Sequence, residues 1–172
     1  MDFLVLVLRL IHIFGAVFWA GGSFMLVSFI EPTALKTGEE GQKFMQYLGS
    51  RSKLSSSMGG AAVFTVLSGL ILYYLLFRNN FGGVMSSGYG IFLSFGALFG
   101  ILAWIAGFYF QGRAASRMKA LSEKMAAAGG PPTPDQLAEM QALGKQLSLG
   151  GRISAILLTL ALIGMAGADA AG

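Results

Sequence analysis

Arg9 and His12 are ionisable side chains that lie three residues apart in the first long apolar stretch of the chain. Ionisable groups are costly inside a membrane span and therefore usually mark a function. A spacing of three places both on one face of a helix, and this face continues through Ala16, Trp19 and Ser23. Because the rest of the stretch is mostly Leu, Val, Ile and Phe, we expect this mixed face to point toward the bundle interior or a cofactor.

A neutral imidazole is a good iron ligand, and many haem proteins hold their iron through one histidine. Ala16 lies one turn further along the expected helix and leaves room for a flat ring. Arg9 lies one turn nearer the outside, where haem propionates would reach for water. The spacing thus fits a haem b whose iron is bound by His12, with Arg9, Ala16 and Trp19 as further candidate cofactor-binding residues. A second interpretation stays open: the imidazole hydrogen-bonds to another helix, and Arg9 reaches the outer headgroups.

The second axial ligand of such a haem is less clear from the sequence. Met165 lies near the outer end of the last apolar run and has the best depth of the methionines, whereas Met85 falls in a loop. A five-coordinate haem and a His12 supplied by a second subunit are equal alternatives.

The composition excludes most other chemistries. The 172 residues include no Cys and one His, so a thiolate nucleophile, an iron–sulfur cluster and a multi-histidine site within one chain are excluded. Only 12% of the residues are charged and 55% are hydrophobic, with a mean hydropathy of +0.67. A soluble domain has about 25% charged residues, so a soluble enzyme is not expected. The net charge of +4 comes from basic residues beside apolar runs, and we expect no nucleic-acid partner.

Four apolar runs are the elements that would position these side chains. A membrane-spanning helix needs about 20 apolar residues, and the runs predict spans at about residues 3–30, 57–77, 90–112 and 150–169. The last uncharged run, 153–168, covers only ~24 Å, so residues 147–151 should continue its helix while Arg152 extends to the headgroups. We expect an all-α, up-down bundle of four membrane helices that forms a single transmembrane domain over residues 1–172.

The positions of Lys and Arg predict the orientation. Cytoplasmic loops carry an excess of these residues, and ten of the twelve lie in or beside the loops at 31–56 and 113–149. These ten are Lys36, Lys43, Arg51, Lys53, Arg113, Arg117, Lys119, Lys124, Lys145 and Arg152. The remaining two, Arg9 and Arg78, lie on the other side. Both termini are therefore expected outside the cytoplasm, in a multi-pass membrane protein.

Both cytoplasmic loops are expected to be helical. Thr37 and Glu40 fit a capping box, followed by Phe44, Tyr47, Leu48 and Arg51 on one helical face. In the other loop, Met118, Leu121 and Met125 precede a helix-breaking segment at 129–132, and a second capping box starts at Thr133. The returning stripe contains Leu137, Met140, Leu143 or Gly144, and Leu147, so we expect an antiparallel hairpin. On the opposite side, residues 79–83 are expected to form a loop.

Small residues recur at four-residue spacing in the third and fourth spans. The pairs are Gly96 with Gly100, Ala103 with Gly107, and Gly164 with Ala168. This spacing lets helix backbones approach closely. It favours packing within the bundle, with a homodimer face as the alternative.

A resemblance to a known group of proteins rests on residues 10–22, where His12 is followed by Trp19 and Gly21. This segment resembles the first span of bacterial four-helix membrane proteins. The group comprises an uncharacterised family, the CopD-like copper-resistance proteins and the haem-binding membrane form of protoporphyrinogen oxidase. The sequence Ser68-Gly69-Leu70 is similar to a Thr/Ser-Gly-Leu sequence in the second span of these proteins. In the oxidase branch the first-span histidine binds haem, which implies the same role for His12. The third and fourth spans lack the lysine of the oxidase, so the resemblance implies haem binding rather than oxidase activity.

These observations lead to one favoured function and two alternatives. The favoured one is a haem-b-binding membrane protein that acts as an electron relay or an accessory redox subunit. The alternatives are a non-catalytic subunit that packs on a larger membrane complex through its Gly/Ala faces, and a transporter of a metal or small solute. A homodimer or a larger membrane complex fits each of these functions, and no catalytic residue is identified.

Overall fold

The computed structural model describes residues 3–50 and 52–172, and within these ranges it is helical with no strand. The first helical segment comprises α1 (Phe3–Met25), the π-helical turn η1 (Leu26–Ile30) and α2 (Glu31–Lys36). It is followed by α3 (Glu39–Ser50), α4 (Leu54–Phe77), α5 (Phe81–Met85), α6 (Gly88–Ala106), a second π-helical turn η2 (Gly107–Gly112), α7 (Arg113–Ala128) and α8 (Pro134–Ala170). The all-α fold expected from the sequence is confirmed.

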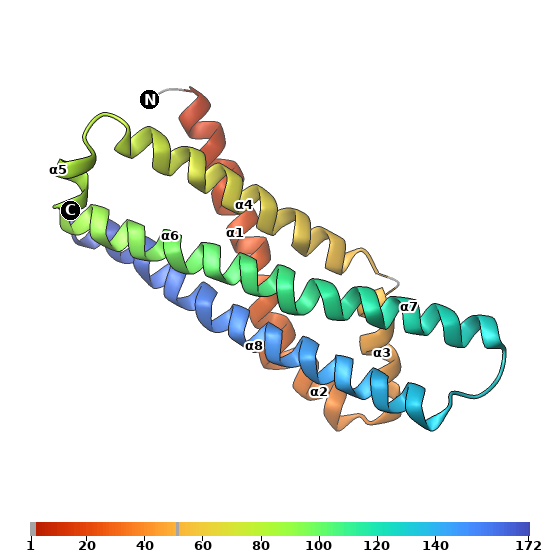
Figure 1. Ribbon diagram of the computed structural model, residues 1–172. Helices are drawn as coiled ribbons and strands as arrows, with labels where there is room; N and C mark the ends of the chain where they lie inside the picture. The colour runs from red at the N-terminus through yellow and green to blue at the C-terminus, as the bar shows by residue number, and fades with distance from the viewer. Residues whose placement is uncertain (1–2, 51) are drawn as a thin grey trace.

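Four of the described helical segments are long and apolar enough to cross a membrane. They are Phe3–Lys36, Leu54–Phe77, Gly88–Ala128 and Pro134–Ala170. The helix that holds the short last run is continuous from Pro134, so residues 147–151 do extend it as expected. The starts of α1 and α6, α5 and the end of α8 lie at one end of the molecule, called here the α5 end (Figure 1). The connection between α7 and α8 lies at the opposite end, called the hairpin end.

The four long helices form two tight antiparallel pairs, α1 with α4 and α6 with α8, with fewer contacts between the pairs. Glycines allow the close approach within each pair. A Cβ on Gly15 of α1 would lie 2.5 Å from Thr65 Oγ1 of α4. A Cβ on Gly164 of α8 would lie 2.6 Å from the backbone nitrogen of Gly96 on α6. The small-residue spacing of the third and fourth spans is therefore used for packing within the chain.

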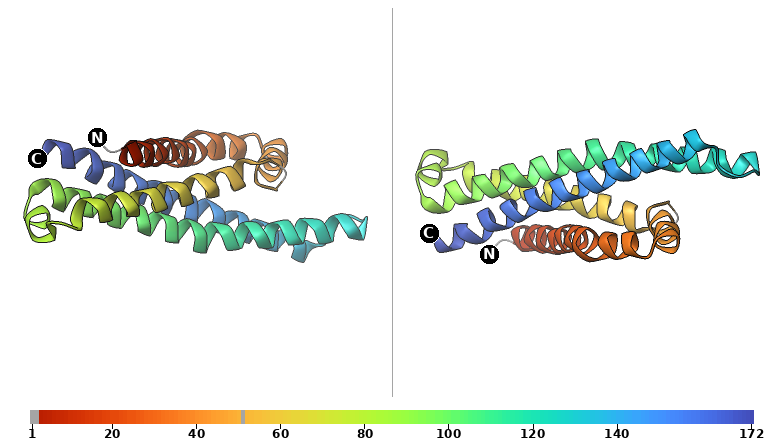
Figure 2. Two further views of the ribbon diagram at one scale, coloured as in Figure 1. Left: turned by 90° about the horizontal axis from the view of Figure 1, so that it is seen from above. Right: turned by 90° about the horizontal axis from the view of Figure 1, so that it is seen from below.

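The charged hairpin follows the sequence prediction closely. Ala114, Leu121 and Leu143 form its buried centre, with Met118, Met125, Met140 and Leu147 packed around them. Gly129 ends α7 at φ +65°, and Thr133 caps α8 in a capping box with Gln136. Leu137 differs from the prediction because it stays 49% exposed, beyond the point where the two helices meet. The hairpin extends past α2 and α3 in both views (Figure 2).

Two local predictions were wrong. The Thr37 hydroxyl does not begin the following helix; it donates to the carbonyls of Thr33 and Ala34 and thereby ends α2. Gly38, at φ +63°, makes the turn to α3 in place of a capping box. At the α5 end, residues 81–85 form the short helix α5 rather than a loop, because the Asn80 side chain caps it at Gly83. Arg51, predicted on the apolar face of α3, lies outside the described residues.

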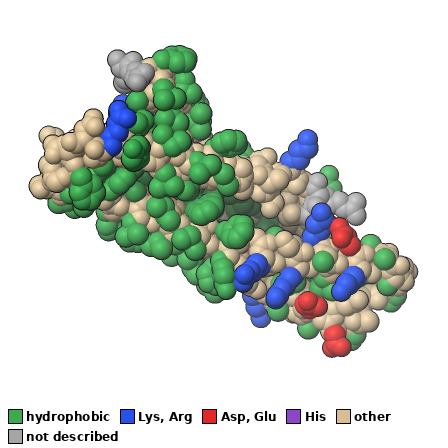
Figure 3. All heavy atoms as spheres, turned by 45° about the horizontal axis from the view of Figure 1, so that its top comes forward, with side chains coloured by type: hydrophobic (Ala, Val, Ile, Leu, Met, Phe, Trp, Pro, Cys, Tyr) green, Lys and Arg blue, Asp and Glu red, His purple; other side chains and the backbone are tan. Residues whose placement is uncertain are grey.

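The surface separates into an apolar body and a charged end. Large hydrophobic side chains along the four long helices are exposed, including Phe14 at 70%, Phe64 at 63% and Ile163 at 56%. Charged side chains gather near the hairpin end, while hydrophobic side chains cover most of the rest of the face shown (Figure 3). Contiguous apolar surface of this kind is rare on a soluble monomer. It is compatible with a multi-pass membrane protein.

Candidate functional site

The His12 side chain is held against α4 by a hydrogen bond. Its Nδ1–H donates to the backbone carbonyl of Thr65 over 2.8 Å. Since a carbonyl can only accept, this bond places a proton on Nδ1, and in the neutral ring Nε2 then keeps a lone pair. Histidines that bind metals commonly donate their other ring N–H to a backbone carbonyl in this way. The hydrogen bond to another helix, expected as the second interpretation, is therefore present and uses only one of the two ring nitrogens.

A glycine on α4 makes room for the imidazole. A Cβ on Gly69 would lie 2.7 Å from His12 Cε1 and 2.9 Å from His12 Nδ1. Any residue larger than glycine at position 69 would push the imidazole away from the Thr65 carbonyl, which lies one turn earlier on α4. The Ser68 hydroxyl also donates to this carbonyl, over 3.2 Å. The two segments that carry the family resemblance, 10–22 and the Ser68-Gly69 step, thus meet in space.

His12 lines a small cavity between the two helix pairs. The cavity has a volume of about 30 Å³, which exceeds the about 10–15 Å³ that one water molecule needs. It is enclosed by His12, Ala16, Trp19 and Ala20 of α1, Thr65 of α4, Gly100 of α6, and Leu158, Ala161, Leu162 and Met165 of α8. The cavity therefore places an imidazole and a thioether in one otherwise apolar space between helices.

The predicted site residues divide into two groups. His12, Ala16 and Trp19 line the cavity together, and Trp19 is 7% exposed. Arg9 does not line it and is exposed on α1, one turn nearer the α5 end. The face that runs from His12 to Ser23 does point into the bundle, since Trp19, Ala20 and Ser23 are the buried residues of α1.

The two methionines considered as second ligands differ in position. Met165 lines the His12 cavity from α8. Met85 lies in α5, where its sulfur accepts a hydrogen bond from Ser94 Oγ over 3.4 Å. Of these two methionines, Met165 is therefore the one that shares a cavity with His12.

Comparisons of the chain with protein-family models, with curated proteins and with solved structures found no match. The site is therefore interpreted from its own geometry.

The His12 and Met165 side chains suit a haem iron, but the cavity beside them is too small for a porphyrin. The free Nε2 of His12 is a suitable axial ligand, and a thioether is a known partner of histidine on haem iron. A porphyrin is many times larger than the water-sized space beside His12. It would enter only if the α1–α4 pair moved away from the α6–α8 pair, along the seam where contacts are fewer. No group of three or more His, Cys, Asp or Glu side chains in the described ranges could hold a metal ion.

The residues of α4 at the site were not predicted from the sequence. Thr65 and Ser68 are polar residues inside an apolar span, and both are buried, at 7% and 4% exposure. Their hydroxyls bond to carbonyls of their own helix, so the contribution of Thr65 to His12 is its backbone carbonyl, which a side-chain motif does not reveal. A second polar contact, Gln111 Nε2 donating to Ser154 Oγ over 3.0 Å, joins η2 to α8 nearer the hairpin end.

Proposed function

We propose that the chain is a multi-pass protein of a bacterial inner membrane whose four long helices cross the bilayer in up-down order. Four apolar helical segments and exposed apolar side chains along them support this proposal. The concentration of Lys and Arg at the hairpin end supports a cytoplasmic hairpin and termini on the other side. The lipid bilayer is then the main partner of the apolar surface.

Within this bundle, we propose that the protein binds haem b between its two helix pairs and acts as an electron relay or accessory redox subunit. The observation that carries this proposal is the hydrogen bond from His12 Nδ1 to the Thr65 carbonyl, which leaves Nε2 free beside an interhelical cavity. A bound haem would supply a one-electron redox centre. The resemblance of residues 10–22 to the haem-binding branch of the family supports the same assignment.

The residues of this chain would act as follows. His12 would hold the haem iron through Nε2, and the Thr65 carbonyl fixes the orientation of its ring. Met165 is the candidate second ligand from α8. Arg9, one helical turn or ~5 Å closer to the α5 end, would pair with a propionate, because a carboxylate in an apolar region needs a partner.

The small volume of the cavity favours a second candidate, transport or storage of a single metal ion. A space of about 30 Å³ with an imidazole nitrogen and a thioether sulfur suits one ion of a soft metal. Purified protein that carries a stoichiometric metal ion and no porphyrin would support this candidate over haem.

Haem titration in detergent tests the main proposal. The wild-type protein should develop a Soret band that saturates at one haem per chain, and His12→Ala should lose it. Ile13→Ala is the matched control, because Ile13 is the next residue on α1 and is 55% exposed. Arg9→Leu should release haem faster than Arg78→Leu, which removes the other outer arginine. A wild-type protein without a Soret band under ample haem supply would refute the proposal.

A further inference from the structure

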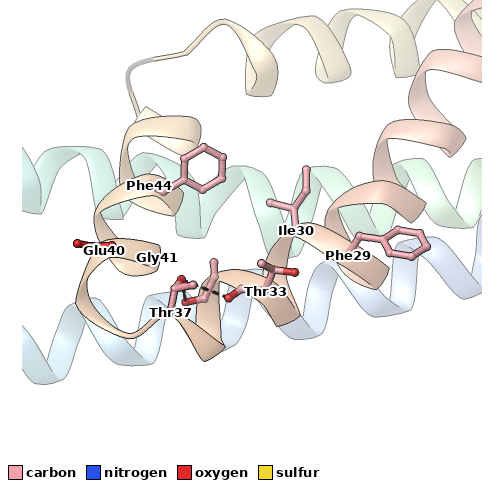
Figure 4. A pocket seen from close by; sticks show the side chains of 8 residues that line it. Phe29, Ile30, Thr33, Thr37, Glu40, Gly41 and Phe44 are labelled. Atoms are coloured by element: carbon pink, nitrogen blue, oxygen red, sulfur yellow. Dashed lines mark hydrogen bonds between the residues drawn. The ribbon is translucent and has the colours of Figure 1, made fainter.

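An open groove of about 460 Å³ lies toward the hairpin end, where η1, α2 and α3 meet. Figure 4 shows Phe29 and Ile30 of η1 on one side and Phe44 of α3 on the other, with Thr33 of α2 below. Glu40 lies at its α3 edge. We call this space the interfacial groove. It is separate from the His12 cavity and shares no lining residue with it.

The sequence builds this groove by folding α3 back onto α2. Gly38 makes the turn at φ +63°, and Thr37 Oγ1 ends α2 by donating to the Ala34 carbonyl over 3.1 Å. A Cβ on Gly41 would overlap the carbonyl oxygen of Ala34, so only glycine lets α3 approach α2 this closely. Ala34 is consequently buried at 7% exposure and closes the floor between the two helices.

Residues in and beside the two π-helical turns are of the kinds that gather at a membrane–water boundary. Glu31, the residue after η1, lies 3.9 Å from Arg152 of α8, and the Arg113 guanidinium stacks 4.1 Å from the centre of the Tyr109 ring. Aromatic and basic residues are enriched where acyl chains give way to headgroups. The groove therefore opens at the depth where the apolar surface of the bundle ends.

The apolar walls of the groove are open to the surroundings. Phe29 is 70% exposed and Phe44 is 51% exposed. Ile30 and Phe44 line the groove from its two sides, whereas the Phe29 ring points away from Phe44 (Figure 4). An acyl chain from the adjacent leaflet would cover the Phe44 ring, and the exposed apolar surface of α1 leads to the groove.

The charge at the rim indicates which headgroup fits. Glu31 pairs with Arg152, and Glu39 pairs with Lys43, whose hydrogen bond and positive charge lower the pKa of Glu39. Glu40, which lines the groove, has no ion-pair partner within residues 3–50 and 52–172. A free carboxylate at the mouth of an apolar groove complements a positively charged headgroup.

We propose that the interfacial groove binds one phospholipid whose headgroup carries an ammonium, of the phosphatidylethanolamine type. One acyl chain lies between Ile30 and Phe44, and the ammonium pairs with Glu40. The proposal rests on membrane insertion and does not depend on haem binding.

Native mass spectrometry of the full-length protein tests the occupancy of the groove. Dioleoyl-phosphatidylethanolamine or dioleoyl-phosphatidylglycerol is added to the detergent-solubilised protein, and the retained lipids are counted. Wild-type protein should retain one more phosphatidylethanolamine than Thr33→Trp, whose indole fills the groove. Leu35→Trp is the control, because Leu35 lies on α2, does not line the groove and is 67% exposed.

A second pair of variants tests the groove without introducing a large side chain such as tryptophan. Phe44→Ala should weaken lipid retention, whereas Tyr47→Ala, on the same helix and 62% exposed, should not. Equal retention by wild type, Thr33→Trp and Phe44→Ala would overturn the groove as the binding site.

The neighbouring glutamates test the headgroup. Glu40→Gln should lose a preference for phosphatidylethanolamine over phosphatidylglycerol of about two- to five-fold, the range expected from one exposed ion pair. Glu39→Gln should keep this preference, since Glu39 already pairs with Lys43. Preferential retention of phosphatidylglycerol, or an unchanged preference in Glu40→Gln, would contradict the proposed ammonium contact.

Discussion

His12 of α1 donates its Nδ1 proton to the Thr65 carbonyl of α4 over 2.8 Å, and this contact defines the candidate site. It joins the two helices of one pair, selects one tautomer of the only imidazole in the chain, and leaves Nε2 free at the seam with the other pair. A ring that served only to join α1 and α4 would not need to line a cavity shared with Met165 of α8. The same contact thus supports both a structural role and a ligand role.

The tautomer of His12 can be measured directly because it is the only histidine. In protein labelled with ¹⁵N-histidine, NMR should show that the neutral ring carries its proton on Nδ1 rather than on Nε2. Gly69→Ala should disturb this pattern, because its Cβ would lie 2.7 Å from His12 Cε1. Gly60→Ala, also on α4, has no neighbour within 4 Å of the added carbon and should leave the pattern unchanged. A proton on Nε2 in the wild type would show that the ring is held differently.

Two glycines one turn apart on α6 should respond oppositely to alanine. A Cβ on Gly96 would lie 2.9 Å from the Ala161 carbonyl oxygen and from the Met165 backbone nitrogen, so Gly96→Ala must push α8 away. Overpacking of this kind costs about 1–3 kcal/mol. A Cβ on Gly100 meets only Ala161 Cβ, at 4.0 Å, so Gly100→Ala should keep or raise stability by up to about 1 kcal/mol. Thermal unfolding in detergent, followed by circular dichroism, checks this contrast, and equal midpoints would contradict the close packing of α6 and α8.

The proposed orientation of the bundle rests on ten of the twelve basic residues lying in or beside two loops. A reporter that is active only in the cytoplasm should be silent at the C-terminus and active when inserted at residues 129–132. The reporter placed at residues 129–132 is the control, because its activity shows that the fusion protein is made and enters the membrane. Activity at the C-terminus would mean that the topology is inverted or that α8 does not cross.

The hairpin should resist proteases except at its tip. The centre around Leu121 and Leu143 is buried, whereas the connection between α7 and α8 is exposed. Limited proteolysis should therefore cut at residues 129–132 before any site in α7 or in the first turns of α8, as read by mass spectrometry of the fragments. Simultaneous cleavage throughout residues 114–147 would indicate that the two helices do not pack stably.

Periodicity and helix-capping signals predicted most of the fold. The hairpin could be predicted because Met118, Leu121 and Met125 recur at helical spacing and because Thr133 and Gln136 form a capping box. Thr37 and Glu40 showed the same pattern, but the left-handed turn at Gly38 leaves the Thr37 hydroxyl on the carbonyl end of α2. A capping pattern alone does not determine which of two adjoining helices its hydroxyl serves.

The candidate site was only partly predictable for a different reason. The face from His12 to Trp19 follows from helix geometry, and the depth of Met165 placed it near His12. The Thr65 carbonyl carries no sequence signal, and the pairing of α1 with α4 depends on close contacts at Gly15 and Gly69. The volume of the cavity depends on how all four long helices pack, so no local pattern could predict it.

Chemical rescue of His12→Gly tests the central claim, axial ligation of haem by His12 Nε2, most directly. The variant removes the ring and leaves a space against Gly69 that free imidazole can enter. Haem-loaded wild-type protein should show a Soret band, His12→Gly should lose it, and added imidazole should restore both the band and its wild-type position. A Soret band that is unchanged in His12→Gly without imidazole, or a wild-type protein that binds no haem, would contradict the account.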